Sequence, residues 1–230
     1  MRKLLYVPVI HVDSDLGSIA PAIDKRSTEI CGRERWERHK QIVTTFWDNI
    51  EKYFKKLNAD NLKIYQDGLM ADGELGQKII EEGAQKGSRN YRIVLDLIRR
   101  GGEIRKTEDI ALLKEEYNRI LKLAQSKSLW ERTTAYIGYR FHKGRLMMKR
   151  DKFIADTINK TLKEGETGAL FIGAYHDVLS LLAKDIAVEE VKKREKVKAY
   201  FKMLISGKDE ERFNELGKYL VDRGLLKNEE

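Results

Sequence analysis

Short apolar runs separated by long amphipathic segments are the feature that most limits what this chain can fold into. The runs lie at 4–10, 62–65, 169–172 and 186–191, and each has the length of one buried strand. Between them, apolar side chains recur at helical spacing, most clearly over 34–56. Helices between successive strands favour parallel pairing, because a parallel neighbour needs a long crossover connection. We therefore predict an α/β fold with a mainly parallel central sheet of about four or more strands.

The chain is expected to form a single domain. Its 230 residues suit one α/β unit, and no internal repeat, low-complexity linker or composition break divides them. We predict one α/β domain over 1–230 with a large helical insertion. Helical patterns dominate 76–150, so this segment is a candidate lid or subdomain. Within it, Thr107 is predicted to cap a helix whose first turn contains Glu108.

Charge and cysteine content limit the classes of partner. The net charge is +8, from 45 basic and 37 acidic residues, but the two signs are interspersed, as in 192–196. No zinc-finger or aromatic RNA-binding pattern accompanies the excess, so a nucleic-acid partner is disfavoured. Abundant Lys, Glu and Arg are typical of a heat-adapted protein. The single cysteine, Cys31, excludes an intramolecular disulfide and a cysteine-rich metal site.

Membrane and secretory signals are weak. No apolar run approaches the roughly 20 residues that span a bilayer. Residues 1–10 faintly resemble a signal peptide, but the apolar part is short, contains Pro8 and lacks a small-residue cleavage site after it. We therefore expect a cytoplasmic protein with no membrane span.

Two of the four histidines follow predicted strands. His11 comes directly after the first run, and His176 follows the third run after a short turn. Asp67 follows the second run after one intervening residue. Ligands of open parallel sheets bind outside the carboxyl ends of the strands. We therefore predict that the first and third runs lie side by side in the same direction, and that His11, Asp67 and His176 meet at one edge.

Two kinds of chemistry fit such a group. Two imidazoles and a carboxylate can hold a zinc, manganese or iron ion and leave positions for water, which the metal would activate for hydrolysis. Equally, one histidine can act as a general base without a metal, oriented by Asp13, Asp67 or Asp177. Each histidine also has a purely structural interpretation as a hydrogen-bonded turn residue. His39 and His142 lie in charged helical patterns and are expected at the surface.

A basic stretch over 139–152 is a second feature with chemical potential. Arg145 and Lys149 share one helical face, and Arg150 lies elsewhere around the helix. One of these residues could clamp an anionic substrate, since arginine binds carboxylate or phosphate in bidentate fashion. The alternative is a solvated helix face. Neither a phosphate-binding glycine motif nor a Gly-x-Ser-x-Gly nucleophile motif is present.

The segment 150–177 resembles the closing segment of TraB-like proteins, which belong to the TIKI / erythromycin-esterase-like / ChaN-like superfamily. The shared pattern is an Arg-Asp pair opening a helix, a glycine after that helix, an apolar strand and Gly-Ala-x-His. The pattern is carried by Arg150-Asp151, Gly165, 170–172 and Gly173-Ala174-Tyr175-His176.

The resemblance extends less closely to the first two strands. Residues 6–11 are similar to the superfamily's first strand and its terminal histidine, although Val9-Ile10 stand where the family usually has Gly-Thr or Gly-Glu. Asp67 occupies the place of a usual glutamate. By resemblance, the site residues are His11, Asp67, Arg150 and His176.

Three functions follow as expectations. The first is a TraB-like hydrolase acting on a small or peptide-like substrate, with His11, Asp67, Arg150 and His176 as catalytic residues. In its metal-assisted version, His11, Asp67 and His176 bind a divalent zinc, manganese or iron ion. The second is a non-catalytic protein on the same scaffold that binds a small anion or regulates a partner. The third is a basic interaction or nucleic-acid-binding module. The sequence does not indicate an oligomeric state or whether catalysis occurs.

Overall fold

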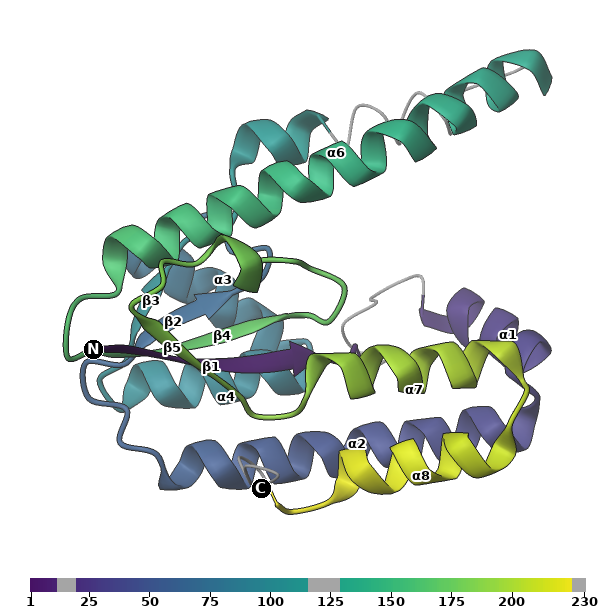
Figure 1. Cartoon of the computed structure of the whole chain (residues 1–230), viewed down its shortest axis with the longest axis horizontal. Coiled ribbons are helices and arrows are strands. Elements are labelled where there is room, and N and C mark those ends of the chain that lie inside the picture. The colour runs from purple at the N-terminus through teal and green to yellow at the C-terminus, as the bar shows by residue number, and fades with distance from the viewer. Residues whose placement is uncertain (12–19, 116–128, 225–230) are drawn as a thin grey trace.

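A five-stranded, all-parallel sheet with helices on both faces forms the body of the molecule (Figure 1). This computed structural model describes residues 1–11, 20–115 and 129–224. The architecture confirms the predicted α/β fold. In chain order the elements are β1 (Arg2–Val9), α1 (Ala20–Cys31), α2 (Arg33–Lys56), β2 (Lys63–Gln66), α3 (Gly73–Gln85), α4 (Arg89–Arg99), β3 (Glu103–Arg105), α6 (Leu129–Thr161), β4 (Thr167–Gly173), the 3₁₀ helix η3 (Leu179–Leu181), β5 (Ile186–Glu190), α7 (Arg194–Ser206) and α8 (Glu210–Val221).

Alternation along the central strands supplies both halves of the core. In β1, Leu4 and Tyr6 pack against α6, whereas Leu5 and Val7 pack on the opposite face against α2, α4, α7 and α8. Adjacent residues of a strand point to opposite faces, so a strand covered on both sides must be apolar at nearly every position. This requirement explains why the strands appear in the sequence as continuous apolar runs.

The strand order β3-β2-β4-β1-β5 places the site. The chain runs outward from β1 to β2 and β3 through α2, α3 and α4 on one face. It returns to β4 through α6 on the other face, and β4 inserts between β2 and β1 (Figure 1). The connection that leaves β1 and the connection that leaves β4 therefore run toward opposite edges of the sheet. Where neighbouring connections diverge in this way, a parallel sheet has a crevice at the carboxyl ends of its strands.

The first and third predicted strands are neighbours, as expected. β1 and β4 pair in parallel with Val9 opposite Gly173, and β2 pairs with β4 with Gln66 opposite Phe171. The carboxyl ends of β1, β2 and β4 therefore lie at one edge of the sheet. His11, Asp67 and His176 all follow these three ends.

Part of the candidate lid belongs to the main fold. Ile80 of α3 and Val94 and Leu97 of α4 are buried in the core beside β1 and β2, and β3 pairs with β2. The sequence missed β3 because this strand has three residues and one apolar side chain, Ile104, too few to show a period. The part of 76–150 that follows β3 includes 116–128, which lie outside the described residues. The N-terminal part of α6 extends beyond the sheet (Figure 1).

In the described ranges, no helix combines the length and apolar content needed to cross a bilayer.

The packing of β4 against α2 can be tested by truncating one ring. Phe171 is fully buried, and its ring centroid lies 5.2 Å from that of Phe54. We expect Phe171→Ala to lower the free energy of unfolding by about 3–5 kcal/mol, measured by guanidinium denaturation. Leu75→Ala removes a side chain that is 63% exposed and should change it by no more than about 0.5 kcal/mol. Similar losses in both variants would contradict the described core.

Candidate functional site

Asp67 and His176 are positioned by the ends of adjacent strands. The Asp67 N–H donates to the Phe171 carbonyl at 2.9 Å, which continues the β2–β4 ladder one residue beyond β2. The His176 N–H donates to the Gly173 carbonyl at 3.1 Å and closes a turn directly after β4. These two hydrogen bonds bring both side chains to the same edge of the sheet.

The buried imidazole of His176 lies between two carboxylates. Its Nδ1 is 2.5 Å from Asp151 Oδ1, and its Nε2 is 3.4 Å from Asp67 Oδ2. The second Asp151 oxygen accepts the Asp177 N–H at 2.8 Å, so the Asp151 carboxylate is held at both oxygens. Burial alone would lower the pKa of His176, but the two carboxylates outweigh it and raise the pKa to about 9. His176 is therefore an imidazolium at neutral pH.

Arg150 holds the other oxygen of Asp67. The Arg150 Nη2 lies 3.3 Å from Asp67 Oδ1 and 2.6 Å from Glu108 Oε2. Burial opposes ionisation of Asp67, but the His176 and Arg150 cations keep its pKa below the ordinary value. Burial has the larger effect on Glu108, whose pKa is raised despite Arg150. Asp67 is thus an ionised carboxylate with a cation facing each oxygen.

The segment that carries Glu108 is fastened to the end of β2. The Thr107 and Glu108 N–H groups both donate to the Leu69 carbonyl, at 2.8 and 3.0 Å. The Thr107 hydroxyl donates to the Gln66 carbonyl. The prediction that Thr107 caps a helix is therefore wrong, because its buried hydroxyl serves the strand end instead. The following helix begins at Ile110, and its Ala111 N–H donates to Asp109 Oδ1 at 2.7 Å.

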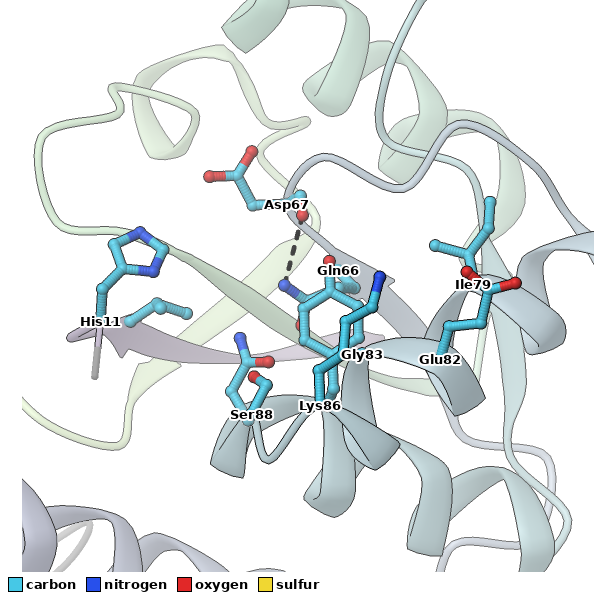
Figure 2. Close-up of a pocket in the computed structure, with 11 residues that line it drawn as sticks. His11, Gln66, Asp67, Ile79, Glu82, Gly83, Lys86 and Ser88 are labelled. Atoms are coloured by element: carbon cyan, nitrogen blue, oxygen red, sulfur yellow. Dashed lines mark hydrogen bonds between the residues drawn. The ribbon is translucent and has the colours of Figure 1, made fainter. Parts of the chain in front are cut away.

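A cavity of about 330 Å³ lies at the carboxyl ends of β1 and β2. Asp67 belongs both to its wall and to the buried ion-pair network, and the exposed His11 lines the cavity as well (Figure 2). The Gln66 amide donates to the Asp67 carbonyl at 3.2 Å and fixes the backbone at this point (Figure 2). The lining consists of Val9, His11, Gln66, Asp67, Ile79, Glu82, Gly83, Lys86, Ser88, Asn90 and Tyr91.

The four predicted site residues thus divide into two groups. Asp67, Arg150 and His176 are in direct contact. His11 lies with Asp67 on the cavity wall, whereas His176 is not part of that lining. The two imidazoles were expected to face each other across a pocket; instead, Asp67 is the residue that joins the cavity to the buried histidine.

The side-chain atoms that would bind a metal face ion-pair partners in this structure. Both ring nitrogens of His176 face carboxylates, and both oxygens of Asp67 face cations, so the lone pairs that a metal would use are engaged. Over residues 1–11, 20–115 and 129–224, no group of three or more His, Cys, Asp or Glu side chains is placed to hold a metal. The zinc, manganese or iron site formed by His11, Asp67 and His176 stays a prediction of the sequence.

Sequence reasoning missed Asp151 as the partner of His176. It considered Asp13, which lies outside the described residues, and Asp67, which does face Nε2 of His176. It also considered Asp177, which instead pairs with Arg194 at 3.2 Å. The Arg150-Asp151 pair was noted in the sequence. Nothing in the sequence shows, however, that the two oxygens of Asp151 contact His176 and Asp177 in the turn after β4. No local pattern indicated Glu108 as the partner of Arg150.

The remaining predicted features have structural roles or lie outside the described side chains. His39 was expected at the surface; this is wrong, because it is buried with its Nδ1 2.9 Å from the Tyr200 hydroxyl. Burial lowers the pKa of His39 to about 4. In the basic stretch, Arg145 is exposed and Lys149 lies 3.8 Å from Glu115. The side chain of His142 lies outside the described part.

The His176 network should make stability depend on pH in a defined direction. The folded-state pKa of about 9 exceeds the ordinary 6.5, so the stabilisation is complete below 6.5 and is lost as pH rises through 9. This shift corresponds to about 3 kcal/mol. Between about pH 6 and pH 10, the free energy of unfolding should fall by about 3 kcal/mol more in the wild type than in His176→Gln. Parallel guanidinium denaturation profiles at both pH values would contradict the network.

No family model matches the chain, no curated protein matches it, and no solved structure matches it.

Proposed function

We propose that the protein is a hydrolase that acts on a small or peptide-like substrate in the cavity beside Asp67. One observation carries this proposal: Asp67 lines the cavity and also pairs with a buried imidazolium. Acid–base sites typically contain neighbouring titratable groups whose pKa values are shifted in opposite directions and which lie beside a cavity. The resemblance to TraB-like proteins adds support, because Arg150, Asp151 and His176 of the similar segment meet at this point.

The proposed roles follow from position and charge. His11, on the cavity wall, accepts a proton from the attacking water, and the Asp67–His176 pair returns a proton to the leaving group. Asp67 is the member that contacts substrate. His176 supplies the proton through Asp67, and Asp151 positions its ring. Arg150 keeps Asp67 ionised, so that the proton resides on His176 before the reaction.

No metal is needed for these steps, since the water and the leaving group are each served by a side chain of the cavity.

We also propose that the protein works in the cytoplasm, in keeping with its single cysteine and the absence of a membrane-spanning helix from the described residues.

The acid role of His176 predicts an alkaline limit to activity. With nitrophenyl esters and short peptides as probes, kcat/KM should fall as pH rises through about 9, where His176 loses its proton. His176→Gln and Asp67→Asn should each lower kcat/KM by about 10²–10⁴-fold, and His176→Gln should also abolish the alkaline limb.

Asp156→Asn is the matched control. It makes the same carboxylate-to-amide change as Asp67→Asn on the surface of α6, where Asp156 pairs only with Lys152 in the described structure. It should retain wild-type kinetics. Unchanged rates in Asp67→Asn, or an alkaline limb that survives in His176→Gln, would overturn the proposed roles.

Metal removal separates the two hydrolase hypotheses. Dialysis against a chelator should leave kcat/KM unchanged, and added zinc, manganese or iron should not raise it. If dialysis abolished activity and one of these ions restored it in the wild type but not in His11→Ala, the metal-assisted version would replace the acid–base mechanism proposed here.

A further inference from the structure

The helix α4 begins at the cavity, and the side chain of its N-cap residue, Ser88, makes no capping hydrogen bond. A serine at this position normally accepts a first-turn N–H. α4 also lacks an acidic residue in its first turn, so its own sequence does not compensate the positive end of the helix dipole. Neither a side-chain cap nor an acidic side chain therefore neutralises this end of the helix.

Buried polar atoms on the cavity wall lack partners. Ser88 is 4% exposed and Asn90 is 3% exposed, and both line the cavity. In the described structure, neither Ser88 Oγ nor Asn90 Oδ1 has a hydrogen-bond partner, and the same is true of Gln66 Oε1. Buried polar atoms are almost always satisfied in folded proteins. Three unsatisfied atoms around one cavity therefore point to a polar ligand.

The charges of the wall favour an anion next to Ser88. Lys86 lines the cavity, and its ammonium forms no ion pair with any residue that the structure describes. Figure 2 shows Lys86 and Ser88 on one side of the cavity, with Asp67 across from them. The charge of Asp67 is already balanced by His176 and Arg150. Glu82 is the remaining acidic group of the lining, and it is exposed.

We propose that Lys86, Ser88 and the first turn of α4 form a subsite for an anionic oxygen group of the substrate, a carboxylate or a phosphate. Helix N-termini bind such groups through backbone N–H donors and the helix dipole, and Lys86 adds a full charge. The Asn90 and Gln66 amide oxygens accept an N–H or O–H next to the anion. The role as a substrate subsite rests on the proposed hydrolase function: an anion held here would place the bond to be broken towards Asp67.

Binding of two simple anions to the full-length protein tests the subsite without any assay of activity. Inorganic phosphate and acetate are titrated separately by calorimetry, with ionic strength held constant by chloride. Lys86→Gln and Ser88→Ala should each weaken binding about tenfold, the effect of losing one charge-assisted hydrogen bond. Glu82→Gln should strengthen binding. Lys78→Gln, an exposed position on α3 outside the lining, should leave it unchanged.

Ser88→Ala carries a second readout. Because the hydroxyl makes no cap, this variant should keep or raise the melting temperature of the ligand-free protein, whereas loss of a working cap would lower it. A lowered melting temperature would therefore contradict the uncapped state of Ser88.

The outcomes separate the subsite from the hydrolase. Preference for phosphate or for acetate identifies the substrate group. Absence of binding, or equal affinity in the wild type, Lys86→Gln and Ser88→Ala, overturns the subsite even if hydrolysis is found. If no ester or peptide is hydrolysed while binding stays sensitive to Lys86→Gln, the subsite stands and the hydrolase proposal fails.

Discussion

The buried pairing of His176 with Asp151 and Asp67 is the interaction on which the rest of the site depends. An imidazole taken out of water would normally lose its proton, because burial disfavours the charged form. Here two carboxylates reverse that preference, and each of them is held in turn. Asp151 is fixed by the Asp177 N–H, and Asp67 is fixed by Arg150. His176 is therefore a buried imidazolium with one carboxylate beside each ring nitrogen.

This network exists because of the order of the strands. β4 inserts between β2 and β1, so the turn after β4 lies beside the end of β2. α6 covers the face of the sheet opposite to α2 and α4, and it contributes Arg150 and Asp151 as neighbours in its sequence. One helix therefore supplies the cation for Asp67 and the anion for His176. The cavity is also lined by Asp67, which makes this residue the link between the cavity and the buried network.

The sequence predicted the parts of this structure that depend on local patterns. Apolar runs located four strands, and the residues after three of them located the site edge. It failed where long-range contacts decide. β3 is too short to show a period, Thr107 is used by a strand end instead of a helix, and His39 is buried by Trp36 and Tyr200 rather than exposed. The Nδ1 partner of His176 was missed for the same reason. The aspartates considered were Asp13, Asp67 and Asp177, each close to a strand end, whereas the residue that contacts Nδ1 is Asp151, 25 positions away.

The protonation state of His176 is the most direct test of this account. The ring nitrogens of the four histidines can be followed by nitrogen-15 NMR as pH is raised, with His176→Gln identifying the relevant signals. Both nitrogens of His176 should carry protons at neutral pH and titrate together near 9, well apart from His39, whose pKa is about 4. A His176 ring that is neutral at pH 7, with an ordinary or lowered pKa, would contradict the balanced network and the acid role that we propose for His176.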